Sequence, residues 1–74
     1  MKSFSEHLKF VRISRNLTQR QVATAIDIGE SLYQRYERGA GKPSFDKLIA
    51  LADYFDVSLD YLVGRTDKPK GGIE

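Results

Sequence analysis

The sequence predicts an all-α domain of five short helices. Apolar residues recur at spacings of three and four residues in successive segments, which is the period of an amphipathic helix. Between these segments lie residues that start or stop helices: Ser, Thr, Asn, Asp, Gly and Pro. No segment has the alternating pattern of a strand. A chain of 74 residues is expected to form one domain, here over residues 1–65, followed by a flexible tail over residues 66–74.

The first two helices are expected over residues 3–14 and 18–26. Their apolar stripes are Phe4, Leu8 and Val11 in the first helix, and Val22, Ala23 and Ile26 in the second. Thr18 supplies a hydroxyl cap at the start of the second helix. Asn16 and Asp27 end the two helices, because both residue types tolerate the left-handed backbone that a tight turn requires.

A third helix is expected over residues 30–38, between Gly29 and Gly39. Its candidate buried positions are Leu32, Tyr33 and Tyr36. The remaining side chains all form hydrogen bonds and face outward together: Glu30, Ser31, Gln34, Arg35 and Arg38. The helix therefore presents one face that is suited to polar recognition.

The last two helices follow a loop over residues 40–43, where Gly41 and Pro43 cannot continue a helix. Ser44 caps the fourth helix, and its broad apolar face predicts near-complete burial on one side. That face consists of Phe45, Leu48, Ile49, Leu51, Ala52 and Phe55. Ser58 caps the fifth helix, which Gly64 ends. Its apolar residues are Leu59, Leu62 and Val63.

The composition argues against several classes of protein. The chain has no cysteine, so neither a disulfide framework nor a cysteine zinc site is available. His7 is the single histidine, which provides neither a metal site nor a catalytic dyad, and we expect it at the surface or at the edge of the core. No apolar run approaches the ~18 residues of a membrane span. We therefore expect a cytoplasmic protein without enzymatic activity, metal, cofactor or membrane association.

Positive charge is concentrated in the first half of the chain. Residues 1–42 hold eight Lys or Arg against four acidic residues, and residues 43–74 hold four against six. The half with the positive balance also holds the second and third helices. This distribution is typical of a surface that binds phosphates, although an ordinary solvated surface would explain it without the helix pair.

The chain resembles the helix-turn-helix domains of phage repressors and Cro, the XRE-like family. The resemblance covers about residues 4–65 without a gap and rests on motifs that match in order and spacing. These motifs are LTQ at 17–19, ERG at 37–39, KPS at 42–44 and DYLVG at 60–64. Two positions depart from the family pattern, since Asp27 stands where Gly is usual and Gly29 where a hydroxyl cap is usual. The resemblance implies a lambda-repressor-like fold.

The resemblance also implies which residues contact DNA. The helix over 30–38 would enter the major groove of double-stranded DNA. The implied base-contacting residues are Glu30, Ser31, Gln34 and Arg35. The implied phosphate-contacting residues are Gln19, Arg12, Arg38, Lys42 and Tyr33.

Several of these positions carry an alternative interpretation. Arg35 either contacts a base or a phosphate, or is a surface residue paired with Glu30 or Asp27. Glu30 either accepts a hydrogen bond from a cytosine amine, stabilises the start of its helix, or excludes wrong sequences. Arg12 matches a family ion pair with Glu37 that joins the first helix to the third, in addition to a phosphate contact. Tyr33 either reaches a phosphate or packs in the core.

The function implied by the resemblance is sequence-specific DNA binding that regulates transcription, as a repressor. A homodimer on a palindromic operator is expected, because one such domain covers a single half-site. The candidate dimer surface on the last helix consists of Leu59, Tyr61, Leu62 and Val63. Two alternatives are the DNA-binding antitoxin of a toxin-antitoxin pair and a helix-turn-helix-derived protein-interaction module. No small-molecule ligand is implied.

Overall fold

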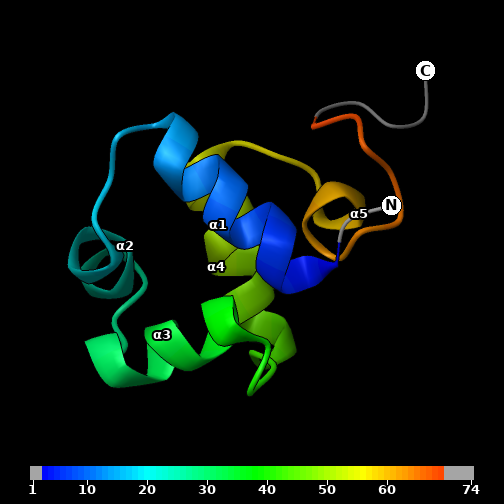
Figure 1. Ribbon diagram of the computed structural model, residues 1–74. Helices are drawn as coiled ribbons and strands as arrows, with labels where there is room; N and C mark the ends of the chain where they lie inside the picture. Colours follow the sequence, from blue (N-terminus) through cyan, green and yellow to red (C-terminus); the bar gives the residue numbers. More distant parts are fainter. Residues whose placement is uncertain (1–2, 70–74) are drawn as a thin grey trace.

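The computed structural model describes residues 3–69, and within them it contains five α-helices and no strand. The helices are α1 (Phe4–Ser14), α2 (Gln19–Ala25), α3 (Glu30–Arg38), α4 (Phe45–Phe55) and α5 (Leu59–Leu62). Figure 1 shows α1 crossing in front of α4, with α2 and α3 on one side of the molecule and α5 on the other. The prediction of an all-α fold with five short helices is confirmed.

Four of the five helices begin with a hydroxyl cap. The caps are Ser3, Thr18, Ser44 and Ser58, and each side chain accepts a hydrogen bond from a backbone N–H in the first turn of its helix. Gly29, at the start of α3, has no side chain to form this bond. The start of α3 is therefore the one helix start in residues 3–69 without a side-chain cap.

All five helices end with the same backbone arrangement. A residue with positive φ follows each helix, and these residues are Asn16, Asp27, Gly39, Asp56 and Gly64. The next residue donates its N–H to the carbonyl five positions earlier, as from Ile28 to Ala23 at 3.0 Å and from Ala40 to Arg35 at 2.9 Å. The left-handed conformations predicted for Asn16 and Asp27 are thus present. They let the chain reverse tightly between helices.

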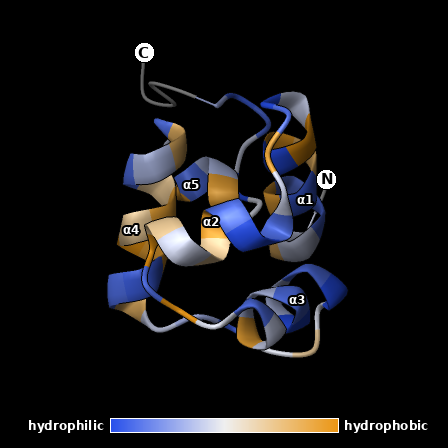
Figure 2. Cartoon of the chain, turned by 90° about the vertical axis from the view of Figure 1, so that its left-hand side faces the viewer, coloured by the Kyte–Doolittle hydropathy of each residue, from blue (hydrophilic) through white to orange (hydrophobic). Residues whose placement is uncertain are grey.

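One hydrophobic core joins all five helices. Its buried residues are Leu8, Val11, Val22, Ala23, Ile26, Tyr33, Tyr36, Leu51, Ala52, Phe55, Tyr61 and Leu62. Figure 2 shows hydrophobic colours concentrated on the inner sides of the helices and hydrophilic colours along much of α3. Two predicted core residues are at the surface instead, since Leu32 is 38% exposed and Phe45 is 66% exposed.

The two exposed residues have separate physical reasons. Leu32 precedes Tyr33 by one residue, so it points about 100° away around the helix axis from the side that packs inward. Phe45 shares the inward face of Leu48 and Ala52, but it is the first residue of α4. The exposure of Phe45 shows that the buried core does not extend to the first turn of α4.

His7 lies inside the core, so its predicted place at the surface or edge is wrong. It is 1% exposed, its ring stacks on the ring of Tyr61 at 4.3 Å, and its Nδ1 donates to the Tyr61 carbonyl. The imidazole gains a partner there for a nitrogen that burial would otherwise leave unsatisfied. His7 thereby connects α1 to α5.

The predicted dimer surface is also corrected. Tyr61 is 4% exposed and Leu62 is 0% exposed, so both side chains belong to the core of the single chain. Leu59 is partly buried against the same core, and Val63 is 39% exposed. A four-residue helix has only one face that can pack inward, and in α5 that face is buried in the core of the single chain.

The segment after α5 packs back onto the domain. The N–H of Ser58 donates to the carbonyl of Pro69 at 2.8 Å, and the Oδ1 of Asp67 lies 3.5 Å from the Nε2 of His7. The expectation of a free tail is therefore not met at residues 66–69, while residues 70–74 lie outside the described residues. No helix within 3–69 has the length and apolar character needed to cross a membrane.

Candidate nucleic-acid interface

The two sides of α3 differ in chemistry. Tyr33 and Tyr36 are buried, at 0% and 4% exposed, and they anchor the helix to the core. On the other side, Ser31, Arg35 and Arg38 are exposed, and Glu30 and Gln34 are partly exposed. The structure thus brings all four predicted base-contacting residues, Glu30, Ser31, Gln34 and Arg35, onto one surface helix.

The turn between α2 and α3 is held from several directions. Asp27 has a φ of 61°, and the following Ile28 is partly buried against the core. Lys47 on α4 donates from Nζ to the carbonyl of Ile26 at 2.8 Å, at the end of α2 where carbonyls lack helical partners. These contacts fix the angle between α2 and α3, and with it the direction in which α3 projects.

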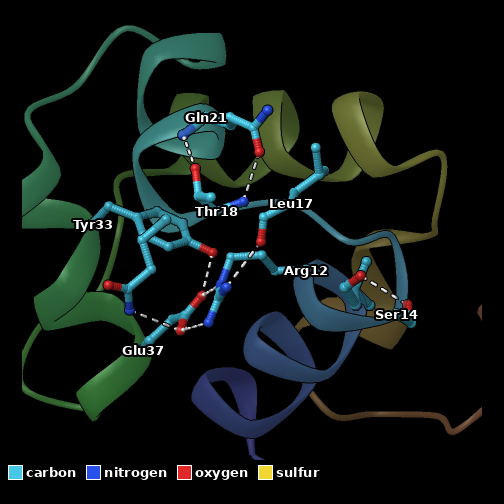
Figure 3. A network of polar contacts seen from close by, with 9 residues as sticks. Arg12, Ser14, Leu17, Thr18, Gln21, Tyr33 and Glu37 are labelled. Carbon is cyan, nitrogen blue, oxygen red and sulfur yellow. Dashed lines mark hydrogen bonds and ion pairs between the residues drawn. The ribbon is translucent and has the colours of Figure 1, made fainter.

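Glu37, near the end of α3, is the centre of a polar network (Figure 3). Its carboxylate accepts from Arg12 on α1 through both oxygens, from Nε at 2.6 Å and from Nη2 at 3.0 Å. The hydroxyl of Tyr33 donates to it at 2.6 Å, and the amide of Gln19 donates at 3.1 Å. Arg12 also donates to the carbonyl of Leu17 at 2.9 Å. The network ties α1, α2 and α3 together.

Burial and hydrogen bonding oppose each other at the Glu37 carboxyl. Burial alone would raise its pKa, but the hydrogen bonds from Arg12, Tyr33 and Gln19, together with the charge of Arg12, hold that pKa below its usual value. The hydrogen bond to Glu37 raises the pKa of Arg12. Burial, followed by the bond to Glu37, raises the pKa of Tyr33. Glu37 is therefore ionised and Tyr33 is neutral near pH 7.

Two of the predicted phosphate-contacting residues, Tyr33 and Arg12, form their hydrogen bonds within this network. The Tyr33 side chain is fully buried and its hydroxyl bonds to Glu37, so Tyr33 is a core residue and the predicted phosphate contact is wrong. The Arg12 side chain is 13% exposed, and three of its N–H groups are already bonded within the domain. The family ion pair implied for Arg12 and Glu37 is present.

The other three predicted phosphate-contacting residues remain available to a ligand. Gln19 is partly exposed and uses one amide N–H on Glu37, which leaves its second N–H. Arg38 and Lys42 are exposed at the end of α3 and in the loop that follows it. Arg38, Lys42 and Gln19 therefore border the polar side of α3 with donor groups.

Arg35 lies against the loop that follows α3. Its Nη2 is 3.5 Å from the carbonyl of Ala40, and a Cβ on Gly41 would lie 3.8 Å from the same nitrogen. The guanidinium is exposed, and the contact with Ala40 uses one of its five N–H donors. Arg35 is therefore supported by the loop and retains the fork of donors that matches a guanine edge.

One ion pair on this surface was missed by the sequence analysis. Arg20, in the first turn of α2, donates from Nε to Oε1 of Glu30, the first residue of α3, at 3.2 Å. The side chains are 82% and 36% exposed. Their separation of ten residues fits no helical period, so only the geometry of the turn brings them together.

Comparison with known proteins agrees with this geometry. Residues 8–62 match the sequence model of the family described as Helix-turn-helix. The uncharacterized HTH-type transcriptional regulator YobD of Bacillus subtilis (strain 168) is 41% identical over 71 residues, which are 96% of this chain and 63% of that protein. The Cryptic phage CTXphi transcriptional repressor RstR of Vibrio cholerae serotype O1 is 40% identical over 60 residues, which are 81% of this chain and 54% of that protein.

A solved structure has the same fold. The crystal structure of the P22 c2 repressor protein in complex with a synthetic operator superimposes with a TM-score of 0.81 at 21% identity, covering 85% of this chain and 96% of that one. The chain spans between half and two thirds of the length of the two curated relatives named above. The matched sequence model, the two relatives and the shared fold agree, and the chain belongs to the helix-turn-helix family of phage repressors and XRE-like regulators.

Proposed function

We propose that this chain binds double-stranded DNA sequence-specifically, by placing α3 in the major groove, and that it regulates transcription as a repressor. The observation that carries the proposal is the division of α3 into a buried side, with Tyr33 and Tyr36, and a polar side that begins at Glu30. An α-helix fits the major groove, and residues near its start reach base edges.

The polar side chains divide into two roles in this proposal. Base contacts come from Glu30, Ser31, Gln34 and Arg35. Phosphate contacts come from Gln19, Arg38 and Lys42, which border the base-contacting face. Phosphate contacts position the protein without selecting a sequence, so the sequence preference would come from α3.

The names of the relatives support a regulatory role. RstR is named a phage transcriptional repressor, and the P22 c2 repressor was crystallised with operator DNA. Because this chain spans only part of RstR and YobD, the activity of a whole regulator is proposed here by analogy. The domain boundary after residue 65 is part of the same proposal, with residues 66–69 packed back onto the domain through the Ser58–Pro69 hydrogen bond and the contact of Asp67 with His7.

A homodimer on a palindromic operator also belongs to the proposal. One domain contacts one half-site, and two half-sites one helical turn apart require two copies about 34–36 Å apart. Of the four residues on the predicted dimer surface, Val63 is exposed enough to contact a second copy. Replacing Val63 with Asp would weaken a dimer built on this residue, and a thermal melt of the variant would verify that the domain remains folded.

The alternative of a protein-interaction module depended on the negative charge of Glu30 at the polar face and on the modest net charge of the chain. Arg20 pairs with the Glu30 carboxylate and offsets its charge, which favours the DNA-binding proposal.

Selection from a pool of random DNA duplexes tests the proposal. The chain is incubated with the pool at two salt concentrations, and bound duplexes are sequenced. The proposal predicts one enriched sequence with two-fold symmetry and weaker retention at the higher salt, since phosphate contacts release counterions. Enrichment of no sequence at either salt would overturn it.

A further inference from the structure

The geometry points to a paired reading unit at the start of α3. We infer that Arg20 bridges the Glu30 carboxylate and a DNA phosphate, and that Glu30, held and neutralised in this way, selects cytosine. The inference rests on the proposed DNA-binding function and deepens it, because it adds Arg20 to the interface and assigns a base to Glu30.

Glu30 occupies an open position at the start of α3. It is the first residue of α3, and the Gly29 that precedes it carries no side chain that could shield it. A Cβ placed on Gly29 would meet no atom within 4 Å, so the space in front of the helix start is open. A side chain at this end of a helix in the major groove reaches base edges.

Arg20 compensates the negative charge of Glu30. A carboxylate facing a phosphate backbone is repelled unless a cation accompanies it. Arg20 supplies that cation, because its Nε lies 3.2 Å from Oε1 of Glu30 across the turn between α2 and α3. The pair is formed in the free protein, so the negative charge of the Glu30 carboxylate is already offset before the protein contacts DNA.

The ion pair with Glu30 leaves most N–H donors of Arg20 unused. A guanidinium has five N–H donors, and within residues 3–69 Arg20 uses the one on Nε for Glu30. Its terminal nitrogens are exposed along with the rest of a side chain that is 82% accessible. Arginine binds phosphate through such terminal N–H groups, so the same side chain can contact Glu30 and the DNA backbone together.

The second carboxylate oxygen of Glu30 favours one base. The carboxylate bonds to Arg20 through Oε1, which leaves Oε2 to accept a hydrogen bond from DNA. An ionised carboxylate is an acceptor only, and among the base edges of the major groove the amine of cytosine is a donor without an adjacent acceptor on the same base. Adenine presents a donor beside the N7 acceptor, which a carboxylate would repel. Cytosine is therefore the base that suits Glu30.

Binding constants for single and double variants test the inference on the duplex that the wild-type chain selects. The variants are Glu30→Gln, Arg20→Ala, Arg20→Lys and the double variant Glu30→Gln with Arg20→Ala. Asp60→Asn and Arg65→Ala are controls that break a matched exposed ion pair between α5 and the segment after it, with side chains 54% and 77% exposed. Thermal melts of every variant verify that the domain is folded.

The expected result has three parts. Glu30→Gln loses about tenfold of the discrimination for cytosine at one position in each half-site and gains preference for adenine, which an amide contacts through two bonds. Arg20→Ala lowers affinity and reduces the slope of log K against log salt by about 0.9, the value for one phosphate. Arg20→Ala costs less affinity in the Glu30→Gln background, and Arg20→Lys restores part of the salt slope.

Three results would contradict the inference. An unchanged base preference in Glu30→Gln would show that Glu30 reads no base. Independent effects of Arg20→Ala and Glu30→Gln would show that the two side chains do not act as a unit. A loss of affinity in Arg65→Ala as large as that in Arg20→Ala, together with a gain in Asp60→Asn, would assign the effects to net charge. These failures leave the wild-type selection intact, whereas a wild-type chain that enriches no duplex would overturn the proposed function itself.

Discussion

Arg12 on α1 and Glu37 near the end of α3 are joined by two hydrogen bonds, of 2.6 and 3.0 Å, that use both carboxylate oxygens. The Glu37 side chain is 3% exposed and the Arg12 side chain is 13% exposed, so water screens the pair weakly. The same carboxylate binds Tyr33 and Gln19. This junction sets the position of α3 relative to α1 and α2.

Replacing Arg12 with Met is expected to lower the free energy of unfolding by about 3 kcal/mol, because it leaves a buried carboxylate without its cation. Chemical denaturation measures the change. Arg65→Met is the matched control, since the pair of Arg65 with Asp60 is exposed and should contribute less than about 1 kcal/mol. Equal losses in the two variants would contradict a structural role for the Arg12 pair.

Stability is expected to fall in acid as Glu37 becomes protonated. Its pKa is lowered in the folded state, so the unfolded chain binds a proton more readily than the folded one. The stabilisation is complete above the unfolded pKa of about 4.3, and it is lost as the pH falls below that value through the folded pKa. Denaturation curves between pH 3 and 7 measure it. Glu37→Gln should have a shallower dependence, and an identical slope would exclude Glu37 as the titrating group.

Gly29→Ser is expected to stabilise the domain. Gly29 has a φ of −72° and a ψ of 152°, which serine adopts without strain, and a Cβ there meets no atom within 4 Å. The hydroxyl can cap α3, and the unfolded chain loses flexibility, so we expect a gain of about 0.5–1 kcal/mol. Thermal denaturation measures it as a higher Tm. A lower Tm would mean that the start of α3 needs glycine.

Gly39→Ala is expected to have the opposite effect. Gly39 has a φ of 75°, where a Cβ is strained, whereas the added carbon would make only an ordinary contact with Oγ of Ser5 at 3.6 Å. The strain costs about 1–2 kcal/mol. The Tm values of Gly39→Ala and Gly29→Ser are measured by thermal denaturation under the same conditions. Each variant is the control for the other, because both replace a glycine that adjoins α3. A neutral Gly39→Ala would show that the end of α3 relaxes at no cost.

Much of the fold could be predicted from local signals. Helix starts follow from hydroxyl caps such as Thr18, and helix ends follow from residues that accept positive φ, such as Asn16. The periodicity also identified most of the core. It failed at Phe45, because a helical period specifies a face but not how far along the helix the neighbouring elements extend.

The site was less predictable because its contacts join separate helices. The bond from Tyr33 to Glu37 spans one helical turn, so the spacing of four residues was a usable signal. The pair of Arg20 and Glu30 crosses a turn, and no periodicity indicates it. The burial of His7 depends on the stacked ring of Tyr61, which lies 54 residues later in the chain.

The central claim is that the polar side of α3 selects a DNA sequence, and Arg35→Ala tests it most directly. The measurement is the affinity of the wild-type and variant chains for the selected duplex and for duplexes with each G·C pair replaced by A·T. We predict that Arg35→Ala weakens binding to the selected duplex and loses discrimination of about 1–3 kcal/mol at one G·C pair in each half-site. Equal discrimination by both chains at every position would contradict the account.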